Sequence, residues 1–331
     1  MNFLLFLCLS FQITPISPKL SIIGIDFFTL LPDSETEIFF NPASAFFWDK
    51  KILFSISSYH PYLSLSENLP ISFQTLLNTK IDKGKYFLNI AYHYLLSREK
   101  KNKKFFFLNY HNLPFSVGYN LGEIKIGLGI GYQRFYLEKT DTLNQNFCEK
   151  GRYLPLKIGF LKGEEKRWEV ITEFIPFDTN NFNGQQLNFT LRKIFGEIDK
   201  HFFTFKMDYQ KKGGKRNWEC IFGYCLSSYY NFYGFIFNNL FSVKTIIFFN
   251  DEKEINMRVI FPNAFIFSFG KMRFLFGLKK EIILDKENAY FVDYKYNFGL
   301  NYSYLNNFEF YFLNMPVNNH RRWFLNLEIF F

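Results

Sequence analysis

Residues 289–304 read AYFVDYKYNFGLNYSY, and their chemistry alternates from one residue to the next. The even-numbered positions from Tyr290 to Tyr304 are aromatic or aliphatic, whereas most odd-numbered positions, such as Asp293 and Lys295, are polar residues or glycine. Successive side chains of a β-strand point to opposite faces of the sheet. The stretch therefore predicts a long strand with one apolar face and one hydrated face.

The same alternation recurs along most of the chain. Residues 123–133, 203–210 and 217–224 each carry an apolar side chain at every second position, and polar or glycine-rich turns separate such units. Strands of a transmembrane β-barrel have this pattern because one face meets lipid and the other faces the lumen. We predict an all-β fold, an antiparallel transmembrane β-barrel of about 14 strands, within a range of about 12 to 16.

The composition agrees with a chain that has two different faces. Aromatic residues make up 22% of the 331 residues, yet the mean hydropathy is −0.10. No window reaches the roughly 18 apolar residues that a membrane helix needs. The formal net charge is +9, but its most basic run, residues 98–104, lies between two strand-like segments and is interpreted as a hairpin turn. No nucleic-acid partner is expected.

The pattern divides the chain into three parts. Residues 1–18 begin with a short apolar run and are interpreted as a signal peptide, which implies export through the inner membrane. The region that follows, up to about residue 50, does not alternate and contains several Gly, Pro, Asp and Asn residues. From residue 51 to residue 331, strands of about 9 to 12 residues are expected.

The C-terminal stretch resembles the signal by which bacterial outer-membrane proteins are recognised for barrel insertion. Apolar residues occupy every second position up to the last residue, namely Trp323, Leu325, Leu327, Ile329 and Phe331. The resemblance implies location in the bacterial outer membrane, with outer-membrane lipid and the barrel-assembly machinery as partners.

Charged residues of both signs fall on the polar face of the predicted strands. The residues predicted to face the lumen are Lys125, Arg192, Lys206, Asp208, Asp293, Lys295 and Glu328. Mixed signs favour cross-strand pairing in a polar lumen. There is no GxSxG elbow, HExxH helix or Cys/His ligand spacing, so we predict no enzyme activity, no metal site and no cofactor.

Within the non-alternating region, residues 34–43 read SETEIFFNPA and resemble the start of the FadL-like outer-membrane proteins, including the PorV/PorQ branch. Asn41, Pro42 and Ala43 match the family's Asn-Pro-Ala turn, whereas residues 44–46 depart from its usual Gly-Leu-Ala. The resemblance implies that residues 19–50 form a hatch-like plug inside the barrel. An Asn-Pro pair suits such a corner, because proline fixes one dihedral and asparagine bonds neighbouring backbone.

The resemblance also implies the leading functional hypothesis, which is passive transport of hydrophobic or amphipathic small molecules. In that scheme a ligand passes by displacing the plug or through a lateral opening. The alternative is a PorV/PorQ-like barrel that serves a protein secretion or surface-attachment system, with secretion proteins as partners and no small-molecule transport. A third hypothesis is an open porin. Fold alone does not decide among them.

Overall fold

The computed structural model describes most of the chain after the predicted signal peptide. The described residues are 19, 23, 27, 30–32, 36–47, 52–57, 71–101, 104–140, 146–163, 166–181, 183–251, 255–284, 289–304, 307–317 and 320–330. The predicted signal peptide, residues 1–18, lies outside them. Among the described residues, no helix is long and apolar enough to cross a bilayer.

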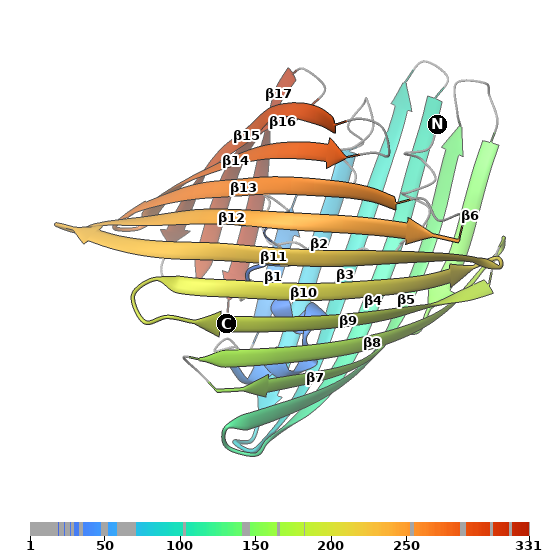
Figure 1. Ribbon diagram of the computed structural model, residues 1–331, viewed down its shortest axis with the longest axis horizontal. Helices are drawn as coiled ribbons and strands as arrows, with labels where there is room; N and C mark the ends of the chain where they lie inside the picture. The colour runs from blue at the N-terminus through green and yellow to red at the C-terminus, as the bar shows by residue number, and fades with distance from the viewer. Residues whose placement is uncertain are drawn as a thin grey trace.

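The described residues form an antiparallel β-barrel, and β1 pairs with β17 to close it (Figure 1). The helical segments α3 and η2 precede the first strand. The elements are α3 (Glu37–Phe40), η2 (Pro42–Phe47), β1 (Ile52–Ser57), β2 (Ile71–Asp82), β3 (Tyr86–Lys101), β4 (Lys104–Asn120), β5 (Ile124–Thr140), β6 (Asn146–Tyr153), β7 (Leu156–Lys162), β8 (Arg167–Thr179), β9 (Asn183–Phe195), β10 (Lys200–Lys212), β11 (Lys215–Phe232), β12 (Phe235–Asn250), β13 (Ile255–Phe269), β14 (Met272–Leu284), β15 (Ala289–Tyr304), β16 (Phe308–Val317) and β17 (His320–Phe330).

The 17 strand segments make a ring of 16 strands. Both β6 and β7 pair with β5 on one side and β8 on the other, so they are two parts of one strand that is interrupted at residues 154–155. The predicted fold class is confirmed, and 16 strands lie at the upper end of the predicted range. The estimate of about 14 was low because apolar residues flank turns such as 233–234, so hairpins such as β11–β12 lack a polar break.

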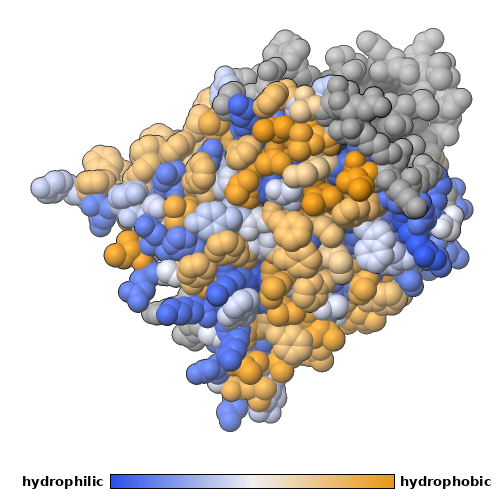
Figure 2. All heavy atoms as spheres, in the orientation of Figure 1, coloured by the Kyte–Doolittle hydropathy of each residue, from blue (hydrophilic) through white to orange (hydrophobic). Residues whose placement is uncertain are grey.

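Burial in the barrel is the reverse of burial in a water-soluble protein. On β5, Leu128 and Ile130 are each 51% exposed, whereas Lys125 and Gln133 of the same strand are 7% and 2% exposed. Figure 2 shows apolar residues in a band across the middle of the visible face, with hydrophilic residues toward its ends. The outer face is therefore suited to hydrocarbon and the inner face to a polar lumen.

The strand predicted by residues 289–304 is β15, and it contains a bulge. The register between β14 and β15 shifts between Lys279 and Glu281, which places Val292 opposite the buried Glu281. A one-residue shift exchanges the two faces of the strand beyond it. Val292 therefore faces inward, while Phe291 is 70% exposed, the reverse of the predicted alternation. From Tyr296 onward the predicted alternation is confirmed.

Many strands are longer than the sequence pattern predicts. β5 has 17 residues and β11 has 18, against the predicted 9 to 12 or so. Turns such as 213–214 and 233–234 contain only two residues, so ladder pairing continues to the very end of each hairpin. The additional residues belong to these hairpin ends.

The exposed apolar face leads to a prediction about charge. Leu128 on β5 and Leu121 in the preceding turn are 51% and 57% exposed. We expect Leu128→Arg to lower the free energy of unfolding by about 2 kcal/mol, because a cation on the lipid face must enter hydrocarbon. Leu121→Arg should change it by less than about 0.5 kcal/mol. Guanidinium titration of the protein in lipid vesicles measures both, and equal effects would contradict a lipid-facing β5.

Candidate functional site

The segments α3 and η2 lie inside the ring of strands. Figure 1 shows them in blue behind the strands nearest the viewer. η2 contacts β3, β4, β5 and β7, and its residues Pro42, Ala43 and Ala45 are buried. We call the described residues from Ile23 to Phe47 the lumen segment.

Asn41 and Pro42 form a tight corner between α3 and η2. The Asn41 Oδ1 atom accepts a hydrogen bond of 3.0 Å from the Ala43 backbone N–H, and the Asn41 N–H donates to the Glu37 carbonyl at 2.7 Å. Ser44 donates to the Asn41 carbonyl from both its backbone N–H and its hydroxyl. Together with the fixed dihedral of proline, these bonds set the direction in which η2 leaves α3.

A buried ionic cluster joins α3 to the barrel wall. Arg192 of β9 is fully buried, and its Nη1 atom lies 3.0 Å from Glu37 Oε1 and 2.9 Å from Glu169 Oε2. The Nε atom of Arg167 lies 2.7 Å from the other oxygen of Glu169. The cluster therefore contains two cations and two carboxylates. Truncating one member would leave a buried polar group without its partner, so the cluster holds α3 specifically against β8 and β9.

Two lysines of the wall donate to backbone carbonyls of the lumen segment. Lys157 Nζ lies 2.6 Å from the Phe39 carbonyl oxygen, and Lys80 Nζ lies 2.9 Å from that of Ala45. The last carbonyls of a helix have no partner within the helix and carry partial negative charge. Lys157 also pairs with Glu173 of β8 at 2.8 Å. These contacts satisfy polar groups that would otherwise be buried without partners.

The end of η2 is held by cations over an aromatic ring. Lys125 Nζ lies 4.6 Å from the centroid of the Phe47 ring, and the Arg167 guanidinium carbon lies 5.0 Å from it. Such cation–π contacts are stronger in a site from which water is excluded. Phe47 therefore connects the lumen segment to β5 and β8 at once.

The opposite side of the lumen is apolar. Ile23, Phe27 and Leu30 are at most 2% exposed and form one cluster with inward side chains of β9–β16. The buried wall members of the cluster are Ile194, Phe202, Cys225, Leu240, Ala264, Ile266, Leu275, Tyr311 and Leu313. A Cβ at Gly223 would lie 2.0 Å from a methyl carbon of Leu30, so the wall is fitted closely to this side chain. The contacts of the lumen segment are thus ionic on the side of β2–β9 and apolar at this cluster, which we call the apolar half; charged residues such as Lys244 and Glu281 are also buried on the same strands.

Two glycines on the ionic side leave room for the lumen segment. A Cβ at Gly127 of β5 would lie 2.4 Å from the Ala43 backbone nitrogen, and one at Gly159 of β7 would lie 2.1 Å from Asn41 Oδ1. Neither glycine was identified from the sequence as part of the site. The available signal was the run of glycines on the polar face of residues 123–133, because glycine within a strand often marks the close approach of another backbone.

The predicted lumen residues differ in what they contact. Lys125, Arg192 and Glu328 are buried, and the first two contact the lumen segment. Glu328 of β17 accepts a hydrogen bond of 3.4 Å from the Ser55 hydroxyl of β1, where the barrel closes. Among the residues that the structure describes, no three His, Cys, Asp or Glu side chains gather as metal ligands would.

For the remaining predicted lumen residues the structure describes other surroundings. Lys206 and Asp208 are half-buried and form an ion pair with each other along β10. Lys295 is exposed on β15. Asp293 lies in the same strand, beside the bulge, and its side chain falls outside the described residues.

The predicted insertion signal lies on β17, the closing strand. Leu325 is exposed on the outer face, and Leu327 and Ile329 are half-buried. Trp323 belongs to the same strand, but its side chain, like the whole of Phe331, is outside the described residues. Recognition by an assembly machinery remains a prediction.

Comparisons with known proteins give the fold. No protein-family model matches the sequence, and no curated protein matches it. Among solved structures, the chain is similar to CdiB from Acinetobacter baumannii, with a TM-score of 0.54 and 8% identity over 85% of this chain and 60% of that one. CdiB from Escherichia coli gives 0.53 and 8%, over 85% and 62%. The CymD monoaromatic hydrocarbon channel gives 0.50 and 8%, over 97% and 99%.

These similarities show a shared β-barrel fold. The chain spans 60% and 62% of the length of the two CdiB chains, and nearly the whole of CymD.

Gly127 and Gly129 of β5 provide a matched test of how closely η2 packs against this strand. Gly127→Ala places a carbon 2.4 Å from backbone, so η2 must move, whereas Gly129→Ala meets atoms at ordinary contact distances of 3.5 Å and more. We expect hydrogen–deuterium exchange in residues 36–47 to become faster in Gly127→Ala and to stay unchanged in Gly129→Ala. Unchanged exchange in both variants would contradict the packing of η2 on β5.

The carboxyl group of Glu37 makes the docking of α3 sensitive to pH. Burial raises the pKa of Glu37 to about 7; the Arg192 charge lowers it and the Glu169 charge adds to the increase. When α3 is released into water the pKa returns toward its usual 4.5, so the docked state binds the proton more tightly. Docking is therefore strongest below that usual pKa and weakens as pH rises through about 7.

We expect open-channel events in planar bilayers to become more frequent between about pH 5 and about pH 8. Glu37→Gln keeps the side chain neutral at every pH, so this variant should lose the dependence while retaining the fold. A pH dependence of equal size in Glu37→Gln would assign the effect to another group.

Proposed function

We propose that this protein is a FadL-like passive channel of a bacterial outer membrane for hydrophobic or amphipathic small molecules, with residues 19–50 as its hatch. The lumen segment closes the path at rest, and the ligand passes when this segment is displaced. Barrel insertion uses the C-terminal stretch of β17, and no catalytic step is part of the proposal.

The observation that carries the proposal is the apolar half of the lumen. A simple aqueous pore needs a polar lining, whereas here inward side chains of β9–β14 and β16 form an apolar surface in contact with the lumen segment. Ile23, Phe27 and Leu30 cover that surface. A hydrophobic ligand that enters the lumen competes for the same contacts, because it gains the same burial of apolar area.

The wall beside the lumen segment has an interruption that supports a lateral route. Residues 154–155 separate β6 from β7, although the Pro155 carbonyl still accepts from Gly131 at 2.8 Å. A small cavity adjoins this position and is lined by residues from both sides of the wall, among them Phe39 and Pro42 of the lumen segment, and Pro114 of β4. Proline removes backbone donors and glycine removes side chains, so the wall next to the hatch has fewer of the contacts that hold neighbouring strands together.

A ligand-binding measurement tests the proposal. The probe is 1-aminoanthracene, titrated into nanodiscs that contain the protein, with empty nanodiscs as the reference. We expect saturable fluorescence enhancement and faster hydrogen exchange in residues 36–47 when the probe binds. Leu275→Gln introduces a polar group into the apolar half and should weaken binding about fivefold or more, whereas Leu275→Met keeps its character and should not.

Fluorescence that never exceeds the empty nanodiscs would contradict transport of hydrophobic molecules. Binding that is equal in the two Leu275 variants would place the ligand elsewhere. The secretion alternative predicts stable protein partners on affinity capture from native membranes together with no saturable probe binding. Conductance that does not change when residues 19–48 are deleted would favour an open porin over a hatched channel.

A further inference from the structure

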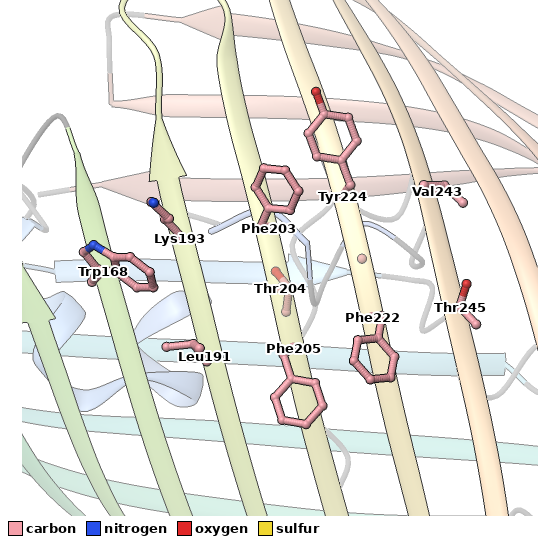
Figure 3. Close-up of a pocket in the computed structure, with 11 residues that line it drawn as sticks. Trp168, Leu191, Lys193, Phe203, Thr204, Phe205, Phe222, Tyr224, Val243 and Thr245 are labelled. Carbon is pink, nitrogen blue, oxygen red and sulfur yellow. The ribbon is translucent and has the colours of Figure 1, made fainter.

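The outer face of β8–β12 carries a groove that the proposed transport path does not use. Its volume is about 450 Å³, and outward side chains of these strands line it (Figure 3). Trp168, Phe203 and Phe222 are each 40 to 50% exposed there, at 42%, 46% and 49%. The groove is therefore apolar and open to the surroundings of the barrel.

Lys193 is the one charged residue among the eleven that line the groove. Its Nζ atom lies 4.6 Å from the Trp168 ring centroid and 5.4 Å from that of Phe195. Within the described part of the chain, no carboxylate forms an ion pair with Lys193. A cation on an apolar outer wall without an anionic partner of its own is a complementary surface for an anion from the bilayer.

The position of Lys193 corresponds to the headgroup level of a membrane. β9 ends two residues later at Phe195, whose ring stacks on His201 with centroids 5.0 Å apart. The His201 ring nitrogen Nδ1 in turn lies 2.9 Å from the Tyr224 hydroxyl. Aromatic rings with polar ends collect at the interface between membrane and water. In Figure 3, Lys193 and Tyr224 lie toward one end of the groove, and Phe205 and Phe222 toward the other.

We propose that this groove binds a glycerophospholipid with an anionic headgroup, its phosphate on Lys193 and one acyl chain along the aromatic side chains. The ammonium group supplies a compact positive charge for the phosphate. The rings of Phe203, Phe205 and Phe222 supply apolar surface against which a hydrocarbon chain can pack. This proposal rests on the proposed membrane location and is independent of transport.

The edge of the barrel at which Lys193 lies indicates which leaflet of the membrane supplies the lipid. The turns at that edge have two to four residues, as at 83–85, 121–123, 196–199, 233–234 and 270–271, whereas the longest connection between strands, residues 58–70 between β1 and β2, belongs to the opposite edge. Short turns of outer-membrane barrels face the periplasm, where the membrane leaflet consists of glycerophospholipids. Lipid A, which carries phosphates in the other leaflet, is the competing source that the experiment must separate.

Quenching of Trp168 by brominated lipids tests the proposal. The chain has four tryptophans, and Trp48→Phe, Trp218→Phe and Trp323→Phe leave Trp168 as the reporter. The protein is reconstituted in phosphatidylcholine vesicles that contain brominated phosphatidylglycerol or, as reference, brominated phosphatidylcholine. We expect phosphatidylglycerol to be preferred about fivefold at the site, which corresponds to one cation near an anionic surface.

Lys193→Gln should reduce this preference to about one, and Lys193→Arg should retain it because the positive charge remains. Lys271→Gln is the matched control: Lys271 lies at the same edge, over the Tyr304 ring at 6.0 Å, and outside the groove. The Lys271→Gln variant should prefer phosphatidylglycerol to the same extent as the unmodified protein. Equal quenching by the two lipids, or a preference that survives in Lys193→Gln, would overturn the assignment.

Two further outcomes identify other occupants. A preference that depends on Lys193 but is larger for lipid A than for phosphatidylglycerol overturns the choice of glycerophospholipid. If quenching by both lipids increased when the protein was diluted in the bilayer, a second copy of the chain would be covering the groove. That result would also overturn the assignment of a glycerophospholipid. If neither lipid quenched Trp168, the membrane location itself would be contradicted. None of the other outcomes bears on ligand binding in the lumen, so the proposed transport is tested separately.

Discussion

Satisfaction of backbone hydrogen bonds is the constraint on which the rest of the structure depends. Hydrocarbon offers no partner to an N–H or C=O group, so a sheet in that medium must have no free edge. Pairing of β1 with β17 provides the closure, with residues 53–57 opposite residues 326–330. Once the ring is closed, the two faces of every strand meet different surroundings, and the alternation of the sequence follows from that division.

Closure also creates the lumen, and the chain partly fills it with its own N-terminal residues. Burying Ile23, Phe27 and Leu30 contributes roughly 1.5–3 kcal/mol for each side chain. The ionic cluster around Arg192 contributes little net free energy, because desolvation offsets most of the attraction between buried charges. The apolar contacts therefore supply most of the free energy of docking, and the charges set its direction. In the proposed transport, a hydrophobic molecule replaces those apolar contacts.

Much of the fold was predictable because it depends on a local, period-two property. The side of a strand on which a residue lies follows from its position, as for Leu128 and Lys125 of β5. The prediction was wrong at Phe291 and Val292, since the bulge in β15 depends on how β14 aligns with it. The interruption between β6 and β7 was likewise invisible, because both parts read as strand and share the same two neighbours.

The sequence by itself determined the two-faced strands, and with them an antiparallel barrel, as well as the tight corner at Asn41 and Pro42. Only the tertiary structure decided which residues meet: Glu37 reaches Arg192 across 155 positions of the chain, and the aromatic neighbours of Lys193 come from separate strands. The physical reason is that alternation specifies the face of each strand, whereas register and the curvature of the closed ring specify which faces lie opposite one another.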